Sequence, residues 1–177
     1  MTTMSVLVAF MLGAVLLGAN PTRAQQPPVP NPLDVVPEAM PFDVPYGAPI
    51  SLERAQASIA AAVAEARKRN WQMNIAIVDS GGNLVAFQRM DGAMLASIRI
   101  AEHKARASVA FRRETKVFET AVHVNHFDDL ITLDGVIASR GGIPLTEMGK
   151  IVGAIGCSGG TSSQDEVACK AGAAAIK

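Results

Sequence analysis

Aromatic side chains are scarce in this sequence, and neither sign of charge predominates. Phe, Trp and Tyr make up 5% of the 177 residues, so we expect a core of small aliphatic side chains between closely packed elements. The chain has 16 Lys and Arg against 16 Asp and Glu. This balance gives no electrostatic reason to expect nucleic acid or an anionic membrane surface as a partner.

The sequence has only two cysteines, Cys157 and Cys169, which are too few for a disulfide framework. An oxidising compartment would permit one bridge. Each cysteine stands where a small apolar residue would serve, so two buried thiols are the preferred interpretation. C-x-x-C, G-x-S-x-G, P-loop and H-E-x-x-H motifs are all missing. No single motif therefore identifies a redox, zinc or catalytic site.

No apolar run is long enough for a membrane-spanning helix, which needs about 20 residues. The longest covers residues 6–19 and carries no charge. Asn20 and Pro21 follow it, and Thr22, Arg23 and Ala24 form a small-residue cleavage site. The pattern predicts a signal peptide over residues 1–24, whose removal leaves a periplasmic or secreted chain of about −1 net charge. The alternative is an uncleaved helix that anchors the chain at a membrane surface.

Proline dominates residues 25–49, which hold eight of the ten prolines. Proline lacks an amide donor and fixes φ, so this stretch is predicted to be an extended linker or arm. Its apolar residues are more than a spacer requires, and they would allow it to pack on the domain or on a neighbouring subunit. Residues 50–177 then form one domain.

Hydrophobic periodicity places helices and strands along that domain. Ser51 is a plausible N-cap for a first helix that Asn70 stops. Strands at 72–79 and 84–89 flank the turn Ser80-Gly81-Gly82-Asn83 and predict a hairpin. Further helices are expected at 94–112, after Thr115 and at 163–175, and further strands at 136–139, 143–145 and 151–158, while 123–134 is ambiguous. The fold class is α/β (α+β), with helices packed on an antiparallel sheet.

Three segments considered together are more specific than any one motif. The first runs from Ala76 through Asp79-Ser80-Gly81-Gly82-Asn83 to Ala93. The second is Ala101-Glu102-His103-Lys104-Ala105-Arg106-Ala107-Ser108, followed by Phe111 and Thr115. The third combines Arg140-Gly141-Gly142-Ile143-Pro144-Leu145, residues 153–160 and Asp165-Glu166.

In order and spacing these segments resemble the GlcG/HbpS family of small haem-binding proteins, which includes the C-terminal domain of PduO-type proteins. The resemblance covers residues 51–176. It implies profilin-like α-β-α layers around a central antiparallel sheet of about five strands. It also implies a homo-oligomer, from dimer to octamer, and haem as the suspected cofactor. Family membership alone does not fix the function.

Haem iron in proteins is held by His, Cys, Met or Tyr. His103, His123 and His126 are therefore the candidate iron ligands, and the last two would share a face if their segment is helical. An exposed or hydrogen-bonded imidazole without a ligand is the alternative for each.

Haem propionates need cations, and the available ones near the matching segments include Arg89 and Lys104. We expect Lys104 to turn inward toward Asp79 or Asp91, where a purely structural pair is the alternative. Other cations close to these segments are Arg106, Arg112 and Arg113.

The leading hypothesis is an exported haem-binding protein that sequesters, relays or slowly degrades haem. The second is an enzyme or binding module for a small organic acid, in which Asp79, Arg89, Asp91 and Lys104 supply acid, base and anion-binding groups. The backbone amides of residues 156–160 would add an anion site near the last helix. The third is a non-catalytic accessory subunit that docks through the proline-rich arm.

Overall fold

The computed structural model describes Asn31, residues 34–40 and residues 42–176. The predicted signal peptide and the first part of the arm lie outside the described residues. The chain divides into two units, residues 1–38 and 39–177, and the second contains all the helices and strands considered below. No helix in the described part of the chain is long and apolar enough to cross a membrane.

A four-stranded antiparallel sheet forms the centre of the second unit, in the order β2-β1-β4-β3. This confirms the predicted sheet type, but the expected five strands are four, and residues 136–139 form none of them. Side chains take the backbone groups at the end of this stretch and just after it: Thr115 donates to the Ser139 carbonyl at 2.8 Å, and the Arg140 amide donates to Glu119 at 2.8 Å. The strands are β1 (Asn74–Asp79), β2 (Leu84–Arg89), β3 (Gly142–Glu147) and β4 (Lys150–Ser158).

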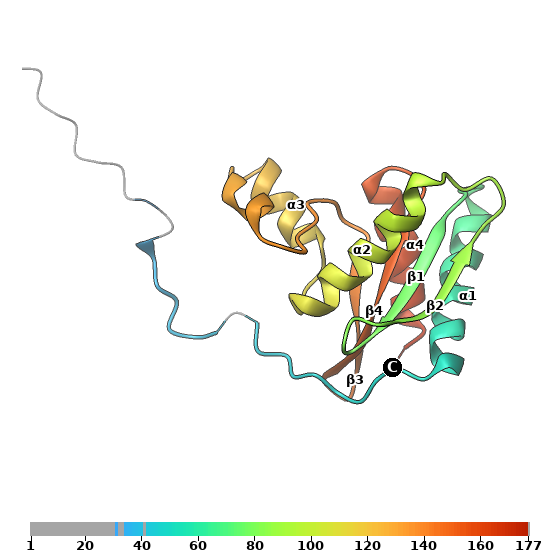
Figure 1. Ribbon diagram of the computed structural model, residues 1–177, viewed down its shortest axis with the longest axis horizontal. Coiled ribbons are helices and arrows are strands. Elements are labelled where there is room, and N and C mark those ends of the chain that lie inside the picture. The colour runs from blue at the N-terminus through green and yellow to red at the C-terminus, as the bar shows by residue number, and fades with distance from the viewer. Residues whose placement is uncertain (1–30, 32–33, 41, 177) are drawn as a thin grey trace, which may run out of the picture. The chain divides into compact units, whose positions relative to one another are not determined.

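Helices cover both faces of the sheet (Figure 1). Helix α2 (Ala96–Ala110) packs on one face, and α1 (Leu52–Lys68) and α4 (Ser162–Ala174) pack on the other. The predicted N-cap is confirmed, because the Ser51 hydroxyl accepts a hydrogen bond from the Arg54 amide. The alternation of β1 sends Ile75 and Ile77 toward α1 and α4, and the smaller Ala76 and Val78 toward α2.

The end of the proline-rich arm packs on the domain rather than acting as a free linker. Tyr46 pairs with Ile151 of β4 beyond the point where β1 ends, and the Ile50 amide donates to the Val152 carbonyl at 2.9 Å. The Tyr46 hydroxyl donates to the Val109 carbonyl at 2.9 Å, at the C-terminal end of α2. Residues 45–50 therefore extend the sheet and cap α2, as expected of an arm whose apolar residues can pack on the domain.

A disulfide joins Cys157 of β4 to Cys169 of α4, with 5.6 Å between their Cα atoms. The preferred interpretation of two buried thiols was therefore wrong. Strand and helix spacing alone gave no measure of this distance, because the approach of α4 to β4 is set by tertiary packing. Both residues are fully buried within the larger core cluster, so the bridge fastens α4 directly to the central strand.

Loss of this bridge is expected to lower the free energy of unfolding by about 3 kcal/mol, because a cross-link over a short loop restricts the unfolded chain. The test is urea unfolding of the wild type and of a C157A/C169A double variant, with and without dithiothreitol. Reductant should lower the wild-type midpoint toward that of the double variant and leave the double variant unchanged. A wild-type midpoint that does not respond to reductant would contradict the bridge.

Candidate functional site

A pocket of about 540 Å³ lies beside α3 (Lys116–His123). We call residues 116–135, which also include the 3₁₀ helix η2 (Asp128–Thr132), the α3 segment; it projects beside α2 in Figure 1. Its wall includes Val117, Thr120, Ala121, Asn125 and Phe127, and its charged lining residues are Glu114 and Lys116. Phe118 is the only fully buried residue of the helix, so α3 leaves an apolar surface open to a ligand.

All three histidines are associated with the α3 segment. His103 of α2 places Nε2 3.1 Å from the carbonyl oxygen of Gly135, the last residue of the segment. His123 ends α3, and His126 has a positive φ of 59°. The two therefore do not share a helical face, which corrects that expectation. Both are exposed, and no hydrogen bond links either side chain to another described residue.

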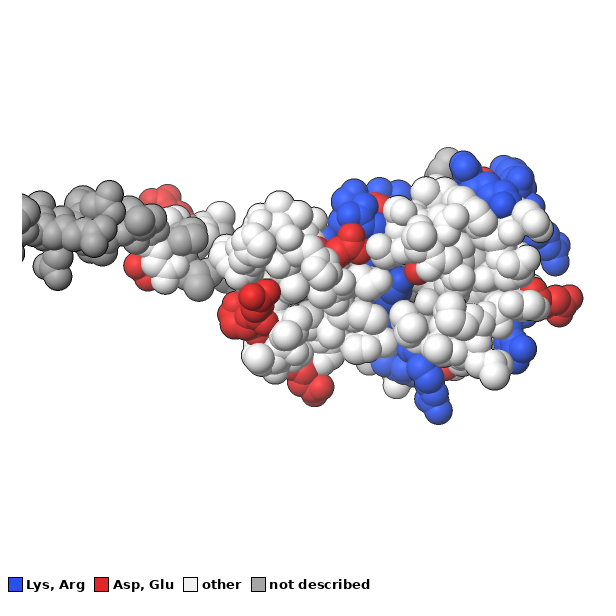
Figure 2. All heavy atoms as spheres, turned by 90° about the horizontal axis from the view of Figure 1, so that it is seen from above, with Lys and Arg blue, Asp and Glu red and all other residues white. Residues whose placement is uncertain are grey.

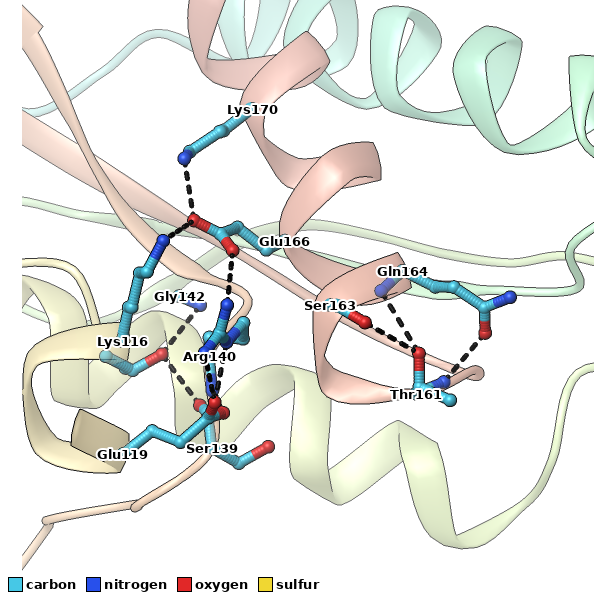
Figure 3. Close-up of polar contacts among 11 residues, drawn as sticks. Lys116, Glu119, Ser139, Arg140, Gly142, Thr161, Ser163, Gln164, Glu166 and Lys170 are labelled. Atoms are coloured by element: carbon cyan, nitrogen blue, oxygen red, sulfur yellow. Dashed lines mark hydrogen bonds and ion pairs between the residues drawn. The ribbon is translucent and has the colours of Figure 1, made fainter. Parts of the chain in front are cut away.

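Ion pairs attach the α3 segment to α4 through Arg140, which precedes β3 (Figure 3). Arg140 lies between two carboxylates: it contacts Glu119 of α3 at 2.6 Å and Glu166 of α4 at 3.2 Å. Glu166 also accepts from Lys116 at 3.3 Å and from Lys170 at 2.6 Å. The cluster contains three cations and two carboxylates, and a third carboxylate, Glu114, lines the pocket, so the charges around the pocket balance.

These contacts shift the acidity of both glutamates. Burial alone would raise the pKa of Glu119, but its hydrogen bonds with Arg140 outweigh burial and lower the pKa below its usual value. Burial would also raise the pKa of Glu166. Hydrogen bonds from Lys170 and Lys116 outweigh burial, so the pKa of Glu166 is lowered. Both side chains are therefore carboxylates at neutral pH. Of the five residues in this ion-pair cluster, only Lys116 lines the pocket.

Lys104 does turn inward, but its partner is neither Asp79 nor Asp91. Its Nζ lies 2.7 Å from an oxygen of Asp165 on α4, and both side chains are almost completely buried. Asp165 also accepts from the Gly160 amide at 3.1 Å. Burial raises the pKa of Asp165, although Lys104 and the amides of Gly159 and Gly160 oppose that rise. The amides predicted to bind an external anion are thus used by an internal carboxylate.

The other predicted site residues lie in separate places. Asp79 accepts from the amides of Gly81 and Asn83 at 2.8 and 2.9 Å, so it organises the β1–β2 turn. Arg89 and Asp91 line a different pocket, at the end of β2. The acid, base and anion-binding set of Asp79, Arg89, Asp91 and Lys104 is therefore not assembled.

The other candidate propionate cations are also occupied elsewhere. Arg106 pairs with Glu102, Arg112 lies over the Tyr46 ring, and Arg113 lies over the Phe42 ring. Lys116 is the cation at the α3 pocket, and the sequence reasoning missed it. The helical spacing of Val117, Thr120 and Ala121 beside it was the available signal.

Comparison with known proteins identifies the class to which this fold belongs. Residues 50–174 match the family described as "Haem degrading protein HbpS-like". The chain therefore belongs to the HbpS-like family, as the three sequence segments indicated.

Individual relatives agree with this assignment. Protein GlcG of Escherichia coli strain K12 is 40% identical over 109 residues, which make up 62% of this chain and 81% of GlcG. The crystal structure of HbpS superposes with a TM-score of 0.69 at 30% identity, covering 76% of this chain and 95% of HbpS. A crystal structure of a PduOC:heme complex gives a TM-score of 0.66 at 27% identity, covering 73% and 96% of the two chains.

Replacement of Lys104 by Met is expected to destabilise the protein by about 3–5 kcal/mol, because it leaves the Asp165 carboxylate buried and uncompensated. A K104M/D165N double variant should lose less stability than K104M alone, since the neutral amide needs no cation. Arg106→Gln, on the exposed side of the same helix, is the control and should cost less than about 1 kcal/mol. Equal losses in K104M and the double variant, measured by urea unfolding, would argue against this explanation.

Acidification is expected to weaken the attachment of the α3 segment. The pKa values of Glu119 and Glu166 are lower in the folded state than in the unfolded state. Their stabilisation is therefore complete above the ordinary glutamate pKa and is lost as pH falls through the lowered values.

An R140Q variant should show a flatter dependence of the urea midpoint on pH between about pH 5 and pH 3, around the ordinary glutamate value. Arg99→Gln removes an exposed arginine outside the network and should retain the wild-type dependence. Identical curves for R140Q and the wild type would refute this role of Arg140.

Proposed function

We propose that this chain is an exported haem-binding protein and that the pocket beside α3 holds the haem. The observation that carries the proposal is the pocket of about 540 Å³ with a mainly apolar wall. Haem is a large, flat, apolar ring that carries two carboxylates. A site for it needs apolar walls, a cation and an iron ligand, and the α3 segment has residues of each kind.

The wall side chains Val117, Ala121 and Phe127 would contact the ring, and Lys116 would lie near a propionate. Lys116 is 43% exposed while it contacts Glu166, so its ammonium group is accessible from solvent. The neighbouring Arg140 shares Glu166 with it. Glu114 also lines the pocket, so a propionate would be held by its direct contact with Lys116 and not by a net positive charge.

His123 and His126 do not line the pocket, but each is within two residues of a lining residue, and they are the iron ligands that we propose. Each is exposed and without a side-chain partner among the described residues, so an imidazole nitrogen is available. His103 is the weaker candidate, since its Nε2 is already occupied by the Gly135 carbonyl. When bound, haem would supply redox-active iron to this site. The residues of the chain would hold the ring, neutralise a propionate and ligate the metal.

Two observations support the export part of the proposal. The first is the sequence of residues 1–24, which has the length and cleavage-site pattern of a secretory signal. The second is the Cys157–Cys169 bridge, because disulfides persist in oxidising compartments such as the periplasm or the extracellular space. The haem part of the proposal is supported by analogy, since one similar crystal structure is that of a PduOC:heme complex. The homo-oligomer stays a prediction.

Titration of the purified protein with hemin, followed at the Soret band, tests this proposal. We expect a saturable shift at micromolar hemin for the wild type, and a weaker or altered shift for H123A or H126A. K116Q should bind hemin several-fold more weakly, because one charge-assisted contact is lost. His103→Gln tests the weaker candidate ligand and should retain the shift, and Arg99→Gln, which removes an exposed arginine of α2, is the control and should behave as the wild type.

One outcome would overturn haem binding itself, and another would overturn only the place assigned to the haem. A wild-type protein without a saturable Soret shift would exclude haem binding. A shift that is abolished in H103Q but retained in H123A, H126A and K116Q would place the haem away from the α3 pocket.

A further inference from the structure

A second pocket, of about 320 Å³, lies where α1 and β2 end, and it differs chemically from the α3 pocket. Arg67 in the last turn of α1, and Asn70 and Trp71 just after the helix, line one side. Gln88, Arg89 and Asp91 line the other, at the end of β2. The lining is rich in planar polar side chains, and it includes the only tryptophan in the chain. In Figure 2, Lys and Arg side chains gather at the end of the domain away from the α3 segment.

Backbone hydrogen bonds preform this pocket. Asn70 takes a positive φ of 56°, which ends α1, and the Trp71 amide donates to the Ala66 carbonyl at 3.0 Å. On the other side, the Met90 amide donates to the Met73 carbonyl at 3.0 Å. Trp71 and Met90 both pack against the larger core cluster. A ligand would therefore meet a rigid surface, which lowers the entropic cost of binding.

Two cations of the pocket are free to bind an anion. Glu65 holds Lys68 at 3.2 Å and Arg69 at 2.9 Å, and Arg69 in turn lies over Trp71, 5.2 Å from the ring centroid. Arg67 and Arg89 take no part in this arrangement. Within the described part of the chain, no ion pair or hydrogen bond engages either guanidinium or the Asp91 carboxylate.

The charges and hydrogen-bonding groups of this pocket indicate which kind of ligand it would bind. Two guanidinium groups and one carboxylate leave a single net positive charge, which suits a monoanion, and guanidinium binds carboxylate in a bidentate manner. Asp91 accepts only, so it suits a hydroxyl donor, while the carboxamides of Asn70 and Gln88 both donate and accept. The half-buried indole of Trp71, with Arg69 over its ring, offers a partly exposed apolar group beside these polar groups.

We propose that this pocket binds a sugar acid, that is, a pyranose carrying one carboxylate. The carboxylate contacts Arg67 and Arg89, a hydroxyl donates to Asp91, and the sugar ring lies beside the exposed part of the Trp71 indole. The site is separate from the α3 pocket and does not depend on haem binding.

The single tryptophan makes the test direct, since its fluorescence reports on this pocket alone. Haem-free protein is titrated with D-glucuronate, and with D-glucose and acetate as matched controls. We expect a saturable change in Trp71 emission with D-glucuronate in the millimolar range, and at least about tenfold weaker binding of either control, since each lacks half of the contacts. No saturable change with D-glucuronate would overturn the proposal. Acetate binding as tightly as D-glucuronate would reduce the pocket to a simple anion site and would also overturn it.

Single-residue variants show which side chains contact the ligand. Their D-glucuronate affinity is measured by calorimetric titration, after a urea midpoint has shown that each variant is folded. R67Q and R89Q should each weaken D-glucuronate binding about tenfold, through loss of a charge-assisted contact. Asp91→Asn should lower the preference for D-glucuronate over acetate, because it removes the hydroxyl acceptor while the higher positive charge favours acetate. Arg106→Gln removes an arginine that pairs with Glu102 on α2 and should bind as the wild type does. Wild-type affinity in both R67Q and R89Q would refute the assigned site.

Discussion

Helix α2 lies directly on the backbone of the sheet, and the rest of the structure depends on this close approach. Strands β3 and β4 present Gly142 and Gly156 beneath the helix. A Cβ at Gly142 would overlap the Lys104 carbonyl, and one at Gly156 would overlap the Ala101 carbonyl. Interiors are packed about as densely as organic crystals, so neither position can accept a side chain unless the helix moves. The scarcity of aromatic residues is consistent with this packing.

The close approach also determines how the two faces of the sheet are connected. Lys104 on α2 reaches Asp165 on α4, a helix that covers the opposite face. A buried ion pair contributes less than its Coulomb energy, because both charges lose their hydration. Its main effect here is positional: it fixes the first turn of α4, where Glu166 meets Arg140. The disulfide at Cys169 holds the same helix one turn further along.

Local sequence was sufficient to predict the elements that depend on local signals. Ser51 begins α1, Asn70 stops it, and the turn at residues 80–83 and the bounds of β2 are as predicted. The errors concern contacts between residues that are far apart in the sequence. Lys104 and Asp165 are 61 residues apart, and neither periodicity nor charge indicated that they meet. Residues 136–139 had strand-like composition, but Thr115 and Glu119 take the backbone groups of residues 139 and 140.

The pocket at the end of α1 and the pocket beside α3 differ in rigidity, because their walls differ in how much they pack against the main core. The pocket at the end of α1 is bordered by residues that pack against the main core, so its shape persists as long as the domain is folded. The α3 segment is attached by one buried aromatic residue, Phe118, and by polar contacts at its ends, such as His103 with Gly135. Segments with few buried apolar contacts open at a lower free energy than core elements. The fold therefore combines a fixed polar pocket, suited to a small ligand, with an apolar pocket whose wall can adjust to a larger one without disturbing the sheet.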